Sequence, residues 1–91
     1  MKKPVLRSLD TVHADEASRY MKNAGNDELS AAVAIAIDRN KLDGTLRAPD
    51  EMEIHHALFL LRRARGLAAP SYDDMRLELK KRAAAARSAA A

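Results

Sequence analysis

Three glycines and three prolines punctuate this 91-residue chain, and their positions constrain its fold more than any motif does. Gly25, Gly44 and Gly66 each follow a segment in which apolar residues recur at helical spacing, and glycine commonly ends a helix. Pro49 and Pro70 lie just before or inside an expected first turn, where proline is tolerated. The punctuation therefore predicts four helical segments, over residues 11–24, 27–40, 49–65 and from residue 71 onward.

The first two segments each carry one apolar face at helical spacing. The predicted faces are Ala14, Ala17, Tyr20, Met21 and Ala24 in the first segment, and Leu29, Ala32, Val33, Ala36 and Ile37 in the second. Asn26 or Asp27 is suited to cap the second segment. Part of that segment also has the alternation of a strand, but its alanines favour a helix. In the loop that follows, over residues 41–48, Leu42 and Leu46 are expected to anchor the chain to the core.

The third segment is apolar on two sides when it is drawn with about 100° per residue. One stripe contains Ile54, Ala57, Leu58, Leu61 and Ala64. Met52 and Phe59 fall opposite that stripe beside His56, and Leu60 lies between the two sides. Such a helix is either central in a bundle or covered by a second chain. In the second case, Met52, His56 and Phe59, supported by Leu60, would line a homodimer or partner surface.

The fourth segment begins with a capping signal and ends in a run of alanines. Ser71 and Asp74 have the spacing of a capping box, and Glu78 is well placed to pair with Arg82. Its predicted apolar face contains Tyr72, Met75, Leu79, Ala83 and Ala86. From residue 83 alanine leaves little to bury, so we expect residues 83–91 to fray. The expected fold class is all-α, a small four-helix bundle with one helical domain over residues 11–82, a flexible basic arm at residues 1–10, and a basic, alanine-rich C-terminal helix.

Charge is segregated along the chain. Residues 1–9 carry three bases and no acid, residues 10–61 carry ten acids and five bases, and residues 62–91 carry eight bases and three acids. A positive ridge that could contact nucleic-acid phosphates contains Arg62, Arg63, Arg65, Arg76, Lys80 and Lys81. The basic helices have no asparagine or glutamine, so base reading is not expected. The alternative is a solvated surface whose charge complements the acidic body, within the chain or between chains. The connection between the second and third segments is too long for a helix-turn-helix.

The side chains that could carry catalysis or bind a metal are sparse. The chain has no cysteine, which excludes disulfides, thiolate metal sites and thiol catalysis. The pairs Glu51–His55 and Glu53–His56 offer two ligands each, whereas a zinc site needs three or four. His13 is expected to pack at a helix edge or to cap it. We find no nucleophile in a glycine-rich turn, no phosphate loop and no dinucleotide motif, so we expect no catalytic residue, no metal and no cofactor.

These observations favour a non-enzymatic helical interaction module that binds a protein partner or forms a homodimer. The alternative function is a nucleic-acid accessory protein that binds phosphates without reading sequence, and an enzyme would need a partner to complete its site. No small-molecule substrate is evident. The longest apolar run after the arm, Ala31–Ile37, is far too short to span a membrane, so we expect a soluble cytoplasmic protein with no membrane contact. The alanine and arginine content indicates a GC-rich, bacterial coding genome.

Overall fold

The computed structural model describes residues 11–90, so the predicted arm at residues 1–10 lies outside the described part of the chain. Four helices occupy this part: α1 (Ala14–Asn23), α2 (Glu28–Leu42), α3 (Glu51–Ala64) and α4 (Tyr72–Ala90). No strand occurs among the described residues, and the strand alternative within α2 is therefore rejected. The prediction of an all-α fold with four helices is confirmed.

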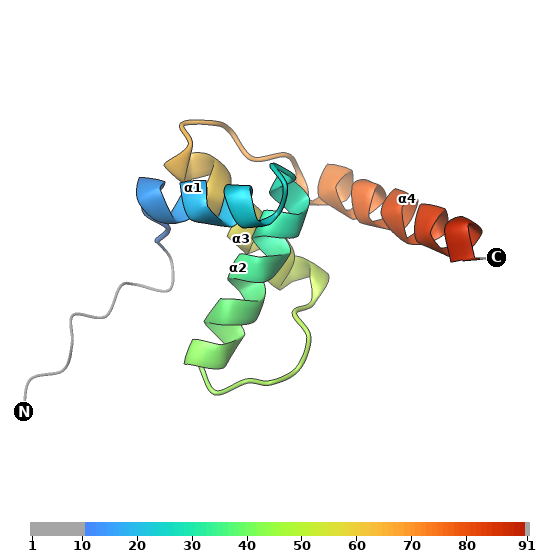
Figure 1. The fold of residues 1–91 in the computed structure, drawn as a ribbon, viewed down its shortest axis with the longest axis horizontal. Helices are drawn as coiled ribbons and strands as arrows, with labels where there is room; N and C mark the ends of the chain where they lie inside the picture. Colours follow the sequence, from blue (N-terminus) through green and yellow to red (C-terminus); the bar gives the residue numbers. More distant parts are fainter. Residues whose placement is uncertain (1–10, 91) are drawn as a thin grey trace, which may run out of the picture.

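Helix α3 is the central element of this arrangement. It packs against α1, α2 and α4, and its longest interface is with α2 (Figure 1). Helix α1 also packs on α2, whereas α4 contacts α3 near its own beginning and then projects away from the other three helices (Figure 1). The prediction of a central third helix is thus confirmed, and the body of the protein consists of α1, α2, α3 and the first turns of α4.

Side-chain oxygens accept hydrogen bonds at the beginnings of α2, α3 and α4, and at the start of α1 the Glu16 carboxylate accepts from the His13 N–H. The Asp27 carboxylate accepts a hydrogen bond from the Ser30 backbone N–H at 3.0 Å, and the Ser71 hydroxyl accepts from the Asp74 N–H at 3.1 Å. Asp50 and Glu53 form a complete capping box, in which each carboxylate accepts from the other residue's N–H at 2.8 and 2.9 Å. Because these caps satisfy otherwise orphaned N–H groups, they fix where α2, α3 and α4 begin.

The ends of α1, α2 and α3 share one geometry. In each, the N–H of the second residue past the helix cap bonds to a carbonyl five positions earlier: Asn26 to Met21 at 2.7 Å, Thr45 to Asn40 at 2.7 Å, and Leu67 to Arg62 at 2.8 Å. This Schellman motif needs a left-handed residue just before the donor, and a glycine with positive φ occupies that position every time. The three glycines therefore follow the helix ends, which lie within two residues of the predicted ends; α2 continues to Leu42, two residues further than predicted.

The core is small and rich in alanine. Leu61 of α3 is the largest side chain that is fully buried. The buried cluster consists of Ala17, Met21, Leu29, Ala31, Ala32, Ile35, Ala36, Ile54, Ala57, Leu58, Leu61 and Met75. Three of its alanines lie on α2 and one on α3, the two helices with the longest interface. Small side chains there let the two backbones approach closely, so modest apolar volume suffices to fill the space between them.

Helix α2 is rotated about its axis relative to the prediction. Ile37 was expected in the core but is 38% exposed, whereas Ile35 is buried. The buried residues of α2 form an arc centred near Ala32, and α2 packs against both α1 and α3. At about 100° per residue, Ile37 lies roughly 140° from Ala32 and so falls beyond this arc.

The loop between α2 and α3 is held by polar contacts rather than by its leucines. Leu46 is 90% exposed and Leu42 is also exposed, so the prediction that they anchor the loop is wrong. Instead, the buried Asn40 amide donates to the Arg47 carbonyl at 3.4 Å, and the Arg47 guanidinium donates to both carboxylate oxygens of Glu53 at 2.8 and 3.0 Å. The hydrogen bonds from the Arg47 guanidinium lower the pKa of Glu53. The paired guanidinium and carboxylate close the loop, which leaves its leucines in solvent.

Candidate interaction surfaces

One surface lies on the side of α3 that faces away from the core, and we call it the α3 outer face. It is defined by Met52, His56, Phe59 and Arg63, which recur every three or four residues along the helix. Met52 is 67% exposed and Phe59 is 43% exposed, and Arg63 is exposed beside them. The structure therefore brings the three principal residues of the predicted partner surface to one helix face.

His56 marks the edge of the α3 outer face that borders α2. Its side chain is half-buried, with Nδ1 3.0 Å from a guanidinium nitrogen of Arg39 on α2. A guanidinium can only donate, so Nδ1 is the acceptor and the ring hydrogen of a neutral His56 resides on Nε2. This contact fixes the imidazole against α2 and leaves Met52 and Phe59 as the accessible apolar part of the surface.

Leu60 does not share that surface, because its side chain is only 3% exposed. On the helix it lies about 100° from Phe59, toward the interior. The sequence assigns Leu60 to the partner surface as a supporting residue, because it lies between the two apolar sides of α3. The structure corrects this assignment, since the side chain is buried within the chain.

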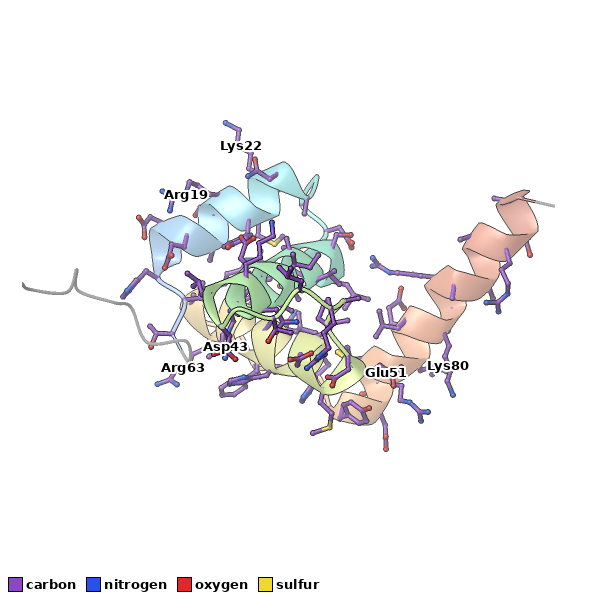
Figure 2. All side chains as sticks on the ribbon, turned by 90° about the horizontal axis from the view of Figure 1, so that it is seen from below. Arg19, Lys22, Asp43, Glu51, Arg63 and Lys80 are labelled. Carbon is purple, nitrogen blue, oxygen red and sulfur yellow. The ribbon has the colours of Figure 1, made fainter. Side chains whose placement is uncertain are left out.

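The predicted basic ridge is divided by ion pairs within the chain. Arg62 and Arg65 both donate to the Glu28 carboxylate at the start of α2, and the Arg76 Nε lies 3.1 Å from Glu51 Oε1. These pairs fit the alternative reading, in which the ridge complements the acidic body within the chain. Arg63, Lys80 and Lys81 make no ion pair with any described residue. Arg63 and Lys80 also lie at opposite sides of the molecule (Figure 2), so the six residues do not form one continuous surface.

The first three turns of α4 are held to the body by one buried side chain and several polar contacts. Met75 is buried, and Tyr72 and Leu79 pack at the edge of the core. Near the start of the helix, the Tyr72 hydroxyl lies 3.3 Å from Glu51 Oε1. Further along, the Arg82 guanidinium donates to both carboxylate oxygens of Asp27 at 2.5 and 2.7 Å.

The contact between Arg82 and Asp27 joins α4 to the beginning of α2. The sequence suggested only the pairing of Arg82 with Glu78 one turn earlier, which also forms, at 3.0 Å. Hydrogen bonds from Arg82 and then from Ser30 hold the pKa of Asp27 well below its ordinary value, and Asp27 raises the pKa of Arg82. Nothing local in the sequence marks this pair, because the two residues are 55 positions apart.

We expect the Asp27–Arg82 pair to make the free energy of unfolding decrease as the pH falls below about 4. A carboxylate whose pKa is depressed by folding stabilises the folded state above its ordinary pKa, which is 3.8 for Asp27. That stabilisation is lost as the pH falls from about 4 toward the lower pKa of the folded state. Arg82→Gln should remove up to about 1 kcal/mol of this dependence, since both side chains are over a third exposed. Urea unfolding of both proteins between about pH 3 and pH 7 measures the effect, and parallel pH profiles would contradict it.

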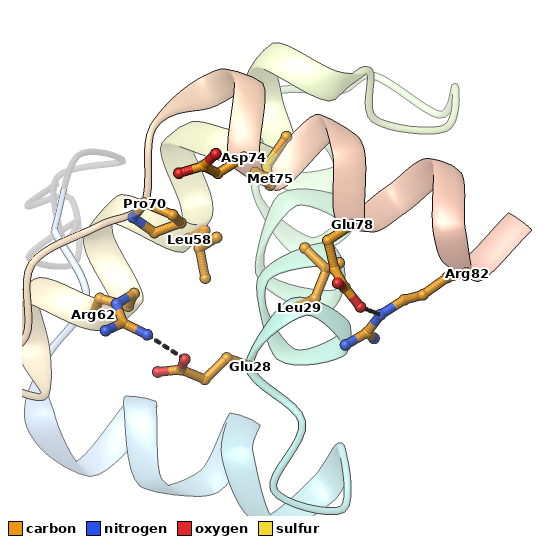
Figure 3. A pocket seen from close by; sticks show the side chains of 9 residues that line it. All are labelled: Glu28, Leu29, Leu58, Arg62, Pro70, Asp74, Met75, Glu78 and Arg82. Carbon is orange, nitrogen blue, oxygen red and sulfur yellow. Dashed lines mark hydrogen bonds and ion pairs between the residues drawn. The ribbon is translucent and has the colours of Figure 1, made fainter.

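A groove of about 250 Å³ opens where α4 leaves the body (Figure 3). Its apolar lining comes from Leu29, Leu58 and Met75, one residue from each of three helices, and from Pro70 in the loop before α4. Four of its charged side chains are paired, as in the Glu28–Arg62 and Glu78–Arg82 pairs drawn in Figure 3, whereas the Asp74 carboxylate makes no ion pair with a described residue. The groove thus combines an apolar interior with ionic groups that are mostly neutralised within the chain.

The histidines of α3 make contacts that do not form a metal site. His55 Nε2 lies 3.0 Å from the Pro70 carbonyl, and the ring stacks edge-on against Tyr72. Among residues 11–90, no three or more histidine and carboxylate side chains gather closely enough to hold a metal ion. His13 is exposed at the start of α1, where its backbone N–H donates to the Glu16 carboxylate at 2.9 Å. Across the described residues, no helix has both the length and the apolar character needed to cross a membrane.

Fold and surfaces together define a small all-helical protein with an exposed apolar patch on its central helix and a projecting basic helix. Comparisons of the chain with protein-family models, curated proteins and solved structures found no match.

Proposed function

We propose that this protein is a non-enzymatic helical interaction module that binds a protein partner through the α3 outer face. The observation that carries the proposal is the joint exposure of Met52 and Phe59 on a helix that packs against all three other helices. Full burial of a methionine or phenylalanine side chain contributes about 1.5–3 kcal/mol, so a partner would gain a substantial part of that from each. Aromatic residues, methionine and arginine are also the residue types enriched at interface cores.

A second copy of the chain is the partner that the charges of α3 favour. Acids occupy the first turn of α3, at Glu51 and Glu53, and bases occupy its last, including the exposed Arg63. A two-fold axis perpendicular to α3 would bring the same face of both copies together with the two helices antiparallel. Each Arg63 would then approach the first turn of the other copy, where it would add to the existing pairs of Glu51 with Arg76 and of Glu53 with Arg47. Because one helix face is much smaller than the roughly 800 Å² per partner of a stable interface, the dimer should be weak.

The homodimer is tested by sedimentation equilibrium from low to high micromolar concentration. We expect the wild-type chain to associate as its concentration rises and Phe59→Glu to remain monomeric, because the new carboxylate would be buried in the interface. Leu77→Glu is the matched control, since Leu77 is exposed on α4 and the substitution adds the same charge. That control should associate like the wild type.

A monomeric wild-type chain would leave a different protein as the partner. Capture from the native host at two salt concentrations, with wild-type and Phe59→Glu chains as baits, addresses that case. Hydrophobic capture should persist at the higher salt and be lost with Phe59→Glu. The proposal fails if the wild-type chain is monomeric and both baits retain the same proteins.

A cytoplasmic location remains part of this proposal. The absence of cysteine supports it, because the fold then needs no oxidising compartment. The bacterial origin suggested by the composition also remains part of the proposal.

A further inference from the structure

The outer part of α4 is a helix without a packing role. Residues 83–89 are all exposed, and in Figure 1 this end of α4 extends away from the other helices. The contacts that hold α4 to the body end at Arg82. Alanine has the highest helix propensity, which accounts for a helix that persists here without apolar contacts. We call residues 80–89, which begin in the last attached turn of α4 and continue beyond it, the α4 extension.

The α4 extension carries positive charge only. Its charged residues are Lys80, Lys81, Arg82 and Arg87, and it contains no acid. Asp27 and Glu78 neutralise Arg82, whereas the other three side chains are exposed and make no ion pair with a described residue. Three available cations therefore lie on a segment of about two and a half helical turns.

The cations are arranged along one side of the extension. Lys80 and Arg87 are seven residues apart, which places them on the same face about 10 Å from one another along the axis. Lys81 lies about 100° around the helix from Lys80. Ala83 and Ala84 lie between Lys80 and Arg87 on that face, so no bulky side chain prevents close approach of a negatively charged surface.

We propose that the α4 extension binds the phosphate backbone of duplex DNA without reading its sequence. The positive charge of the α4 extension attracts a polyanion such as DNA. The major groove of B-DNA is also wide enough to admit an α-helix. The extension has no asparagine or glutamine that would read adenine, and its cations have the range to contact phosphates. This inference is independent of the α3 outer face, which lies on another helix.

Other polyanions fit the extension less well. A membrane-surface helix needs a face of large apolar residues, and none follows Leu79 on α4. Single-stranded nucleic acid is bound by stacking on aromatic side chains, and the extension has none. The deep, narrow major groove of duplex RNA does not admit a helix. Duplex DNA is therefore the partner whose shape and charge the extension matches.

The proposal predicts a specific salt dependence. Three phosphate contacts give a slope of about −2.7 for the logarithm of the association constant against the logarithm of salt concentration. A fourfold rise in salt should then weaken binding by about 40-fold. Fluorescence anisotropy of a labelled duplex of about 20 base pairs, which is two helical turns, measures this with the full chain.

The decisive variant replaces Lys80, Lys81 and Arg87 by glutamine. We expect it to lose more than about tenfold in affinity at low salt and to show a salt slope near zero, because the counterion-releasing contacts are gone. Arg87→Gln alone should reduce the slope by about one. Glutamine is a good helix former and all three positions are exposed, so circular dichroism should show unchanged helix content.

Two controls remove the same amount of charge elsewhere. One replaces exposed cations of α1 and α2, namely Arg19, Lys22 and Lys41, by glutamine. The other replaces the cations of the N-terminal segment, Lys2, Lys3 and Arg7. Both should keep their affinity within about threefold of the wild type, since a local contact depends weakly on distant charge.

Four results would overturn the proposal. They are undetectable binding at low salt, unchanged binding by the α4 variant, an equal loss in either control, and tighter binding to single-stranded DNA or to vesicles containing phosphatidylserine. The first two remove the site. Equal loss in a control assigns binding to net charge or to the N-terminal segment, and the last identifies a different partner.

Discussion

Leu61→Ala is expected to lower the free energy of unfolding by about 3–5 kcal/mol, the upper range for a leucine truncated in a core. Leu61 has no exposed surface and lies on α3, which packs against every other helix. Removing its side chain both forfeits buried apolar area and leaves a cavity among helices that cannot collapse independently. Because small domains are stable by only about 5–15 kcal/mol, this loss is a large fraction of the total free energy of unfolding.

Urea denaturation followed by circular dichroism measures this loss. Met52→Ala is the matched control, because it truncates a large apolar side chain on the exposed side of the same helix. We expect it to cost less than about 0.5 kcal/mol, as is usual for surface positions. Similar midpoints for the two variants would contradict the placement of Leu61 in the core and of Met52 on an exposed face.

Met75→Ala is expected to destabilise the attachment of α4 by about 2–4 kcal/mol. Among residues 72–89 of α4, only Met75 is nearly fully buried, and the other attachments of this helix are exposed or half-exposed. Surface ion pairs such as Arg76–Glu51 contribute little alone, so the loss of Met75 should free α4 before the rest unfolds. The amides of α4 should then exchange hydrogen faster, while those of α2 and α3 keep more of their protection.

Hydrogen exchange measured residue by residue distinguishes this local release from global unfolding. Leu77→Ala provides the control, because Leu77 lies two residues away and is exposed. That variant should leave the protection of α4 unchanged. Equal acceleration of exchange in all four helices by Met75→Ala would mean that α4 is an integral part of one cooperative unit.

The helix boundaries could be predicted because local interactions determine them. A cap joins residues three apart, as in Asp50 and Glu53, and a Schellman motif spans six, as from Arg62 to Leu67. Periodicity also placed Met52 and Phe59 on the side of α3 opposite its apolar stripe, because a helix face is defined within one helix. Whether neighbouring helices cover that side was left open, and the structure shows both residues exposed.

The rotation of α2 could not be predicted in the same way. Ile35 and Ile37 are equally apolar, and either fits an apolar face on α2. The position of α1 and α3 around α2 decided that Ile35 is buried. Leu42 and Leu46 illustrate the same limit, since the bonds between Arg47 and Glu53 hold the loop in a path that leaves both leucines in solvent.

The sequence by itself determined four helices, their caps and a positively charged final segment, because those properties depend on residues within about one or two turns of one another. Only the tertiary structure decided which positive charges are available. Glu28 meets Arg62 and Arg65 across 34 and 37 residues, and Asp27 meets Arg82 across 55. Salt screens Coulomb attraction between such groups beyond about 10 Å, so it is expressed only after the packing of apolar faces has brought distant parts of the chain together.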